Sequence, residues 1–80
     1  MAGSDFSNSS FKRADLRCAD MEGANLRNCN FEYTDMKCAN MKNADLRGAN
    51  MFMANLTHAD LTGAKGAKLD KAIVMFTDGI

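Results

Sequence analysis

The sequence predicts an all-β solenoid with about 20 residues and four sides per coil. Three observations support this fold class. First, a large apolar residue stands at every fifth position along most of the chain. Second, a small residue lies two positions before most of these large residues, usually with Asp or Asn between the two. Third, Gly and Asn follow the large residues in a pattern that repeats every four units. A fixed period sustained over about 60 residues decides the fold before any local propensity does.

Each five-residue unit has one large apolar residue, which we call its centre. The centres are Phe6, Phe11, Leu16, Met21, Leu26, Phe31, Met36, Met41, Leu46, Met51, Leu56 and Leu61. Side chains of an extended chain alternate between faces, so a centre and the small residue two positions before it share one face. An odd repeat length breaks this alternation between units. The two residues after each centre must therefore turn the chain.

The second residue after each centre, which we call the corner residue, indicates how many units make one coil. Gly and Asn tolerate the positive φ required at the third position of a type II turn better than other residues do. From Asn8 to Gly63, the corner residues follow the order Gly or Asn, other, other, Gly or Asn, and this order occurs three times in succession. The pattern predicts four-unit coils with two type II corners and two corners of another kind. Type II corners are expected at Gly23, Asn28, Asn43, Gly48 and Gly63, and the other kind at Tyr33, Cys38, Met53 and His58.

The repeated Ala-(Asp/Asn)-(Leu/Met)-x-x unit, clearest between Ala44 and Gly63, resembles the pentapeptide-repeat family. The resemblance extends from about Asp5 to Lys65. It implies a right-handed quadrilateral β-helix, and the chain is long enough for three to four coils of it.

Three segments are expected. Residues 1–4 are interpreted as a leader that is disordered or draped over the first coil, and residues 5–65 as the β-helix. The register breaks at Gly66, where Gly66-Ala67-Lys68 is interpreted as a three-residue insertion, after which Leu69 and Val74 resume as centres. Residues 66–80 are expected to form a last strand or a short helix that caps the open end, because an uncovered end exposes strand edges.

Stacking of equivalent units in successive coils puts Phe11, Phe31 and Met51 in one inward column, which we interpret as core packing because a narrow interior leaves no room for a ligand. The Asp and Asn residues recur at a bend, where their side chains can bond the local backbone. We favour this role over paired acid-base chemistry. No cofactor is expected.

Cys18, Cys38 and His58 fall in one corner column. Adjacent coils are about 4.8 Å apart, so Cys18 and Cys38 are close enough for a disulfide. A straight ladder suits a tetrahedral zinc site poorly and offers no fourth ligand, so no metal is expected. Cys29 takes an inward position and is expected to be inert. Cysteines without secretory features suggest a reducing compartment, and a cytoplasmic location is expected.

The composition favours neither nucleic acid nor membrane as a partner. Ten Lys and Arg balance ten Asp and Glu, so there is no basic excess of the kind that binds nucleic acid. No apolar run approaches the roughly 18 residues of a membrane span.

The expected function is that of a non-catalytic scaffold or protein-protein interaction module, and no enzyme activity is expected. No Ser-His-Asp order, phosphate loop or metal motif is present. The family resemblance implies two alternatives: a DNA-mimicking topoisomerase inhibitor, or the repeat tail of a BTB-type ubiquitin-ligase adaptor. Such mimics are strongly acidic, whereas the residue after each centre is mostly basic here.

A candidate protein-binding face is predicted on the side of the Phe11, Phe31 and Met51 column. Its outward residues are Lys12, Arg13, Glu32, Tyr33, Phe52 and Met53. Phe52 and Met53 are expected to be the one place where large apolar groups point at solvent, with Tyr33 one coil away. The expected partner is a protein, and self-association through the C-terminal segment is a further expectation. The alternative is that residues 69–76 fold back over this face.

Overall fold

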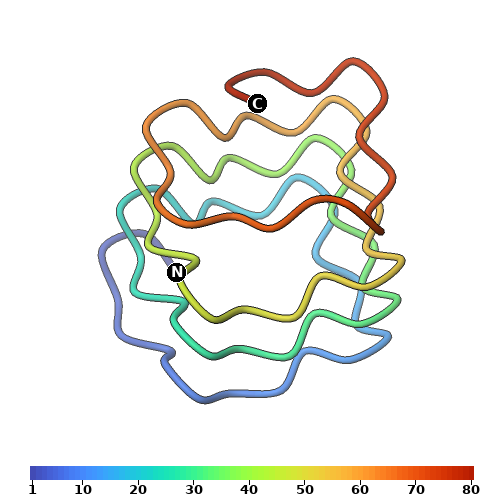
Figure 1. Ribbon diagram of the computed structural model, residues 1–80. Coiled ribbons are helices and arrows are strands. Elements are labelled where there is room, and N and C mark those ends of the chain that lie inside the picture. Colours follow the sequence, from blue (N-terminus) through green and yellow to red (C-terminus); the bar gives the residue numbers. More distant parts are fainter.

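In the computed structural model, residues 1–80 form a stack of coils that ascends from the N-terminal to the C-terminal residues (Figure 1). The chain contains no helix and no continuous strand. Instead, every fifth residue from Asp5 to Asp45 forms an isolated parallel bridge to its equivalent four units later, ending with the bridge between Asp45 and Lys65. This is the spacing that the corner residues predict.

Each unit is held by three kinds of hydrogen bond, as the unit around Phe31 illustrates. The Glu32 N–H donates to Asn30 Oδ1 at 2.9 Å, and the Thr34 N–H donates across the corner to the Phe31 carbonyl at 3.1 Å. The Phe31 N–H joins the next coil by donating to the Asn50 carbonyl at 2.7 Å. The side-chain bond recurs at Asp5, Asp15, Asp20, Asn25, Asp35, Asn40, Asp45, Asn50, Asn55 and Asp60. The structural interpretation of the Asp and Asn residues is confirmed.

The prediction of two corner kinds is wrong, because every corner residue from Asn8 to Gly63 has positive φ. Tyr33 and Met53, expected in the other kind, have φ of 56° and 57°. All of these corners therefore have the positive φ that a type II turn requires at its third position. The left-handed conformation costs a non-glycine residue about 1–2 kcal/mol. The backbone hydrogen bonds that join these corners to the neighbouring coils offset that cost.

Two of the corner glycines, Gly48 and Gly63, nevertheless have a packing reason. A Cβ on Gly48 would meet Asn28 Oδ1 in the coil below, and one on Gly63 would meet Asn43 Oδ1. A glycine here leaves room for the asparagine side chain beneath it.

The centres and small residues from Met21 to Leu61 fill the interior. Phe11 and Phe31 stack with ring centroids 5.3 Å apart and an interplanar angle of 7°, so the predicted aromatic column is confirmed as packing. Cys29 is buried, as expected, and its thiol donates to the Phe6 carbonyl at 3.0 Å. Thr34, the one buried polar residue, donates from Oγ1 to the Phe11 carbonyl at 2.6 Å.

The expectation of a disordered leader is wrong, because residues 1–4 belong to the first coil. The Ser4 N–H donates to the Met1 carbonyl at 3.2 Å, and the Asn25 N–H donates to the Ser4 carbonyl at 2.9 Å. Gly3 has the positive φ of a corner. Met1 lies one unit before Phe6, so it takes the position of a centre and Gly3 that of a corner residue.

Residues 66–80 form a further, shorter pass of the same coil and contain no helix. Ile73 bridges Asn55, and Asp78 bridges Asp60. In both pairs the partners are two positions closer in sequence than in the bridges below. The interpretation of a three-residue insertion is therefore wrong, and the unit that begins at Ala64 is two residues short. An insertion of three and a deletion of two leave the same five-residue phase, so Leu69 and Val74 pack against the core either way.

Candidate functional site

The six predicted face residues lie on one side of the solenoid in three stacked pairs. The Arg13 N–H donates to the Glu32 carbonyl at 2.9 Å, and the Tyr33 N–H donates to the Phe52 carbonyl at 3.0 Å. The ladder thus places each pair directly above the one before it. We call the six residues together, Lys12, Arg13, Glu32, Tyr33, Phe52 and Met53, the aromatic face.

The apolar side chains of the aromatic face are exposed, and its two rings contact each other. Tyr33, Phe52 and Met53 retain 43%, 39% and 41% of their accessible surface. The Tyr33 and Phe52 rings meet edge to face, with centroids 5.7 Å apart and planes at 83°. The Arg13 guanidinium lies over the Tyr33 ring, 4.7 Å from its centroid. Both contacts are favourable for aromatic rings and stabilise this arrangement of the side chains.

Charged groups of both signs lie at the lower margin of the aromatic face. Lys12 Nζ is 3.9 Å from Glu32 Oε1, which also accepts a hydrogen bond from Asn30 Nδ2 at 3.3 Å. An exposed ion pair of this length contributes little to stability. Lys12 and Glu32 therefore remain available to contact other molecules.

Residues 69–76 do not fold back over the aromatic face. The Met53 N–H donates to the Lys71 carbonyl at 2.9 Å, and the Leu56 N–H donates to the Ile73 carbonyl at 2.7 Å. The segment thus continues the stack above Met53 and leaves the face open.

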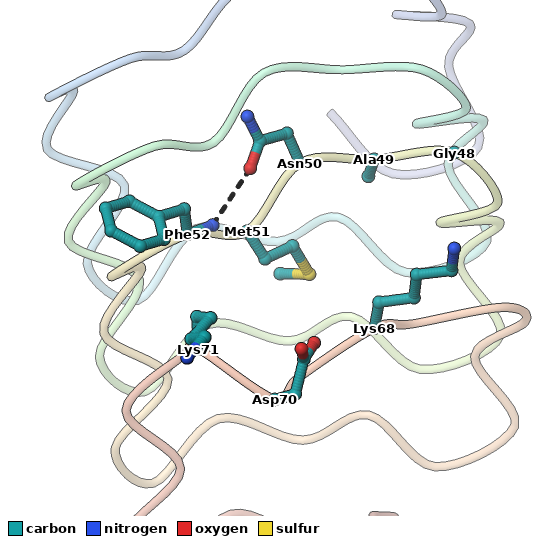
Figure 2. A pocket seen from close by; sticks show the side chains of 8 residues that line it. All are labelled: Gly48, Ala49, Asn50, Met51, Phe52, Lys68, Asp70 and Lys71. Atoms are coloured by element: carbon teal, nitrogen blue, oxygen red, sulfur yellow. Dashed lines mark hydrogen bonds between the residues drawn. The ribbon is translucent and has the colours of Figure 1, made fainter.

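A pocket of about 300 Å³ adjoins the face where the shortened coil passes over the coil beneath it (Figure 2). It is lined by Gly48, Ala49, Asn50, Met51, Phe52, Lys68, Asp70 and Lys71. The Met51 side chain and the Asp70 carboxylate extend from opposite sides into the space between the two segments (Figure 2). Phe52 belongs to both the pocket and the aromatic face. Sequence reasoning missed this pocket because an inserted loop would not have separated the two segments in this way.

The column of Cys18, Cys38 and His58 contacts the C-terminal segment through His58. Cys18 and Cys38 are exposed and free, and the His58 ring stacks on Phe76 with centroids 5.3 Å apart and planes at 10°. No group of three or more His, Cys, Asp or Glu side chains is arranged to hold a metal ion. Burial raises the pKa of the Cys29 thiol, which lowers its reactivity.

A second exposed apolar pair was missed. Met75 and Phe76 are 61% and 75% exposed, so Phe52 and Met53 are not the one such place. From the sequence, these two residues fall within the cap expected for residues 66–80. Their positions as the two residues after the centre Val74 mark them as outward.

The outward carboxylates bind neighbouring cations and backbone groups. Side-chain hydrogen bonds from Arg17 and Arg47 lower the pKa values of Asp15 and Asp45, respectively, to about 2. Groups with such pKa values stay ionised at neutral pH, where a general acid must carry a proton. In addition, no helix in the chain has the length and apolarity needed to cross a bilayer.

Comparisons with known proteins agree with the repeat. The family model of pentapeptide repeats matches residues 1–32, 24–63 and 39–73, with 8 copies. A pentapeptide repeat protein from Nostoc Pcc 7120 is 33% identical and has a TM-score of 0.64, with 95% of this chain and 68% of that chain covered. These matches imply a right-handed β-helix.

Two further solved structures match less closely. A pentapeptide repeat protein from the Arabidopsis thaliana thylakoid lumen is 30% identical, with a TM-score of 0.46 and 95% of this chain covered. Rfr23 from Cyanothece 51142 is 31% identical, with a TM-score of 0.39 and 92% coverage. The chain spans 58% and 55% of these two proteins. No protein with a curated functional description matches.

The family model and the Nostoc structure both cover most of the chain, and the five-residue unit they share is the one that the hydrogen bonds of this structure repeat. This chain therefore belongs to the pentapeptide-repeat family.

Proposed function

We propose that this protein is a non-catalytic protein-binding module, built as a four-sided right-handed β-helix with four five-residue units in each coil, that engages its partner through the aromatic face. The observation that carries the proposal is the exposure of Tyr33, Phe52 and Met53 side by side. The Tyr33 ring contacts both the Phe52 ring and the Arg13 guanidinium. Aromatic and Arg side chains dominate the binding energy of protein interfaces.

The way the chain uses its residues supports a role at the surface. The inward residues pack against each other from Met21 to Leu61, and the Asp and Asn side chains hold the bends. What remains for recognition is the outer surface, where net charge is zero and one side carries an apolar cluster with a charged margin. Such a surface fits a protein partner better than it fits a polyanion or a DNA-binding enzyme.

The partner's location is proposed from the cysteines. All three thiols are free, and two of them are exposed. We place the protein and its partner in a reducing compartment such as the cytoplasm.

The proposal is tested by Phe52→Asp combined with Met53→Lys, a change that leaves net charge at zero. We expect the melting temperature to shift by less than about 4 °C, since exposed substitutions change stability by about 0.5 kcal/mol or less. Binding of a partner captured by the wild-type protein, or self-association measured by sedimentation, should be lost.

The matched control is Met75→Asp with Phe76→Lys, which alters the other exposed apolar pair in the same way. This variant should keep the interaction. Loss of binding in both variants, or in neither, would contradict the proposal. A large fall in melting temperature for the Phe52 and Met53 variant would assign the face to internal packing instead.

A further inference from the structure

The backbone ladder is interrupted at one side of the coil that lies under the shortened unit. The N–H groups of the centres Leu46 and Leu56 donate upward to the carbonyls of Lys65 and Ile73, at 2.8 and 2.7 Å. The N–H of Met51, the centre between them, donates to no backbone carbonyl and no side chain.

The same interruption affects two neighbouring groups. The carbonyls of Ala44 and Ala54 accept from Lys65 and Ile73 at 2.9 and 2.8 Å, whereas the Ala49 carbonyl between them accepts nothing. The N–H of the corner residue Gly48 also has no acceptor. We call the Gly48 N–H, the Ala49 carbonyl and the Met51 N–H together the open edge.

The open edge follows from the two missing residues. Lys65 is still bridged to Asp45, and Ile73 is bridged to Asn55, so the segment between Lys65 and Ile73 is fixed at both ends. This segment covers one side and its corners with two residues fewer than the coil below uses. It therefore takes a shorter path than the coil below. The side from Gly48 to Phe52 is left without hydrogen-bond partners in the coil above it. Figure 2 shows the resulting space between these two segments.

The three groups have the order donor, acceptor, donor, which is the pattern that one strand offers to the next. They border a pocket of about 300 Å³, which gives another chain room to approach them. Unpaired backbone groups of this kind seek partners. An extended peptide supplies the complementary acceptor, donor, acceptor order along its own backbone.

Charge on the opposite side of the pocket indicates which peptide fits. Lys68 and Lys71 are exposed and line the pocket, with Asp70 between them. None of the protein's ion pairs involves Lys68, Lys71 or Asp70. The two free ammonium groups outnumber the one carboxylate, so an acidic side chain is the complement.

We infer that the open edge binds an extended, acidic peptide segment of the partner protein, which adds a short strand between the Gly48–Phe52 side and residues 68–71. This inference rests on the proposed function, since Phe52 joins the pocket to the aromatic face. It adds the chemical class of the segment and the backbone groups that recognise it.

The first test is a titration of the isotope-labelled protein with the blocked peptide Thr-Val-Asp-Val-Thr, followed by amide resonances. The Gly48 and Met51 amides should shift and exchange more slowly with solvent. The same peptide with Lys in place of Asp should bind more weakly by about threefold or more, as expected for the loss of an exposed ion pair. Shifts at other positions, or equal shifts with sodium acetate alone, would overturn the inference.

The second test closes the edge. Gly66→Leu with Thr-Gly inserted directly after it restores a full unit that copies Leu61-Thr62-Gly63. Binding of the peptide should be lost, and the Gly48 and Met51 amides should become protected in the absence of peptide. Unchanged peptide binding by this variant would overturn the inference.

A charge variant keeps the inference testable if the closed-edge variant fails to fold. Lys68→Glu should weaken binding of the acidic peptide, whereas Lys42→Glu, which makes the same change on another side of the solenoid, should not. Equal effects of the two would also overturn the inference.

Failure of this inference can be distinguished from failure of the proposed function. The closed-edge variant retains Tyr33, Phe52 and Met53. If it still binds the partner while no version of the protein binds the peptide, the inference falls and the aromatic face stands. If the peptide binds the open edge but the Phe52 and Met53 variant keeps its partner, the proposed function falls alone.

Discussion

A single carboxylate can support the turn and the surface charge at once, as Asp45 does. Its Oδ1 accepts hydrogen bonds from the backbone N–H of Arg47 at 3.2 Å and from Arg47 Nε at 2.9 Å. Its Oδ2 lies 2.6 Å from Arg47 Nη2 and 3.7 Å from Arg27 Nε. At Asn25 an amide oxygen makes the backbone bond without a carboxylate. The backbone turn therefore requires only a side-chain oxygen, whereas the ion pairs with Arg47 and Arg27 require the negative charge of Asp45.

This division predicts how stability depends on pH. The folded pKa of Asp45 is about 2, below the ordinary 3.8, so its contribution is present at higher pH and is lost as pH falls from about 4 to 2. Asp15 acts in the same direction. Asp45→Asn should keep the turn bond and show a smaller drop in melting temperature over this range.

Thermal melts monitored between pH 2 and pH 7 provide the measurement. Asp45→Ala serves as the control, because it removes the turn bond and should lower the melting temperature even at pH 7. If Asp45→Asn and wild type lose stability in parallel below pH 4, the carboxylate has no role in the acid sensitivity.

At the scale of the five-residue element, one backbone shape is imposed on very different residues. Cys38, Tyr33, Met53 and His58 all hold φ between 56° and 62°, a range that glycine adopts without cost. The sequence could not reveal this uniformity, because residue preference describes an isolated turn and not one held by coils above and below. Gly48 and Gly63 mark places where an asparagine of the coil below needs room, whereas a Cβ on Gly23 would meet nothing.

Replacing a corner residue by glycine and replacing a corner glycine by alanine should therefore change stability in opposite directions. Cys38→Gly should stabilise the protein by about 0.5–1 kcal/mol, because relief of about 1–2 kcal/mol of left-handed strain exceeds the added chain entropy. Gly63→Ala should destabilise it by about 1 kcal/mol or more, because its Cβ would meet Asn43 Oδ1 as well. Urea denaturation measures both, and a stabilising Gly63→Ala would refute this explanation of the corners.

At the scale of the whole molecule, stability is distributed along a stack in which each coil contacts only its neighbours. Phe31 lies within the stack and is fully buried, whereas Phe6 lies in the first coil and is only half-buried. The same residue type thus has two different environments.

Truncation of these two side chains should reduce stability more in the middle of the stack than at its end. Phe31→Ala should lower the free energy of unfolding by about 3–5 kcal/mol, and Phe6→Ala by about 1–2 kcal/mol. Denaturant titration of both variants is the measurement. Equal losses would mean that the first coil is as well covered as the middle of the stack and would contradict this view.

The repeat made most of this architecture predictable. The spacing of the centres fixed the inward face, and the columns of Gly and Asn fixed the four-unit pairing that Asp5 and Asn25 begin. The shortened unit was not predictable, because a loss of two residues and a gain of three leave the later centres at the same positions within the five-residue repeat. The aromatic face could be assembled from the coil spacing, whereas the open edge could be seen only once the pairing of Ile73 with Asn55 was known.

The shortened segment between the Asp45–Lys65 and Asn55–Ile73 bridges also interrupts the regular stack, as a dislocation interrupts a crystal. A uniform stack ends in a layer that matches the next layer at every site, so it can template further growth from identical molecules. Here the segment between Lys65 and Ile73 is two residues shorter than the segment beneath it. A coil added on top could therefore pair along the sides of Ile73 and Asp78 but not along the shortened side. The shortened side thus opposes unlimited end-to-end polymerisation, a hazard of exposed strand edges.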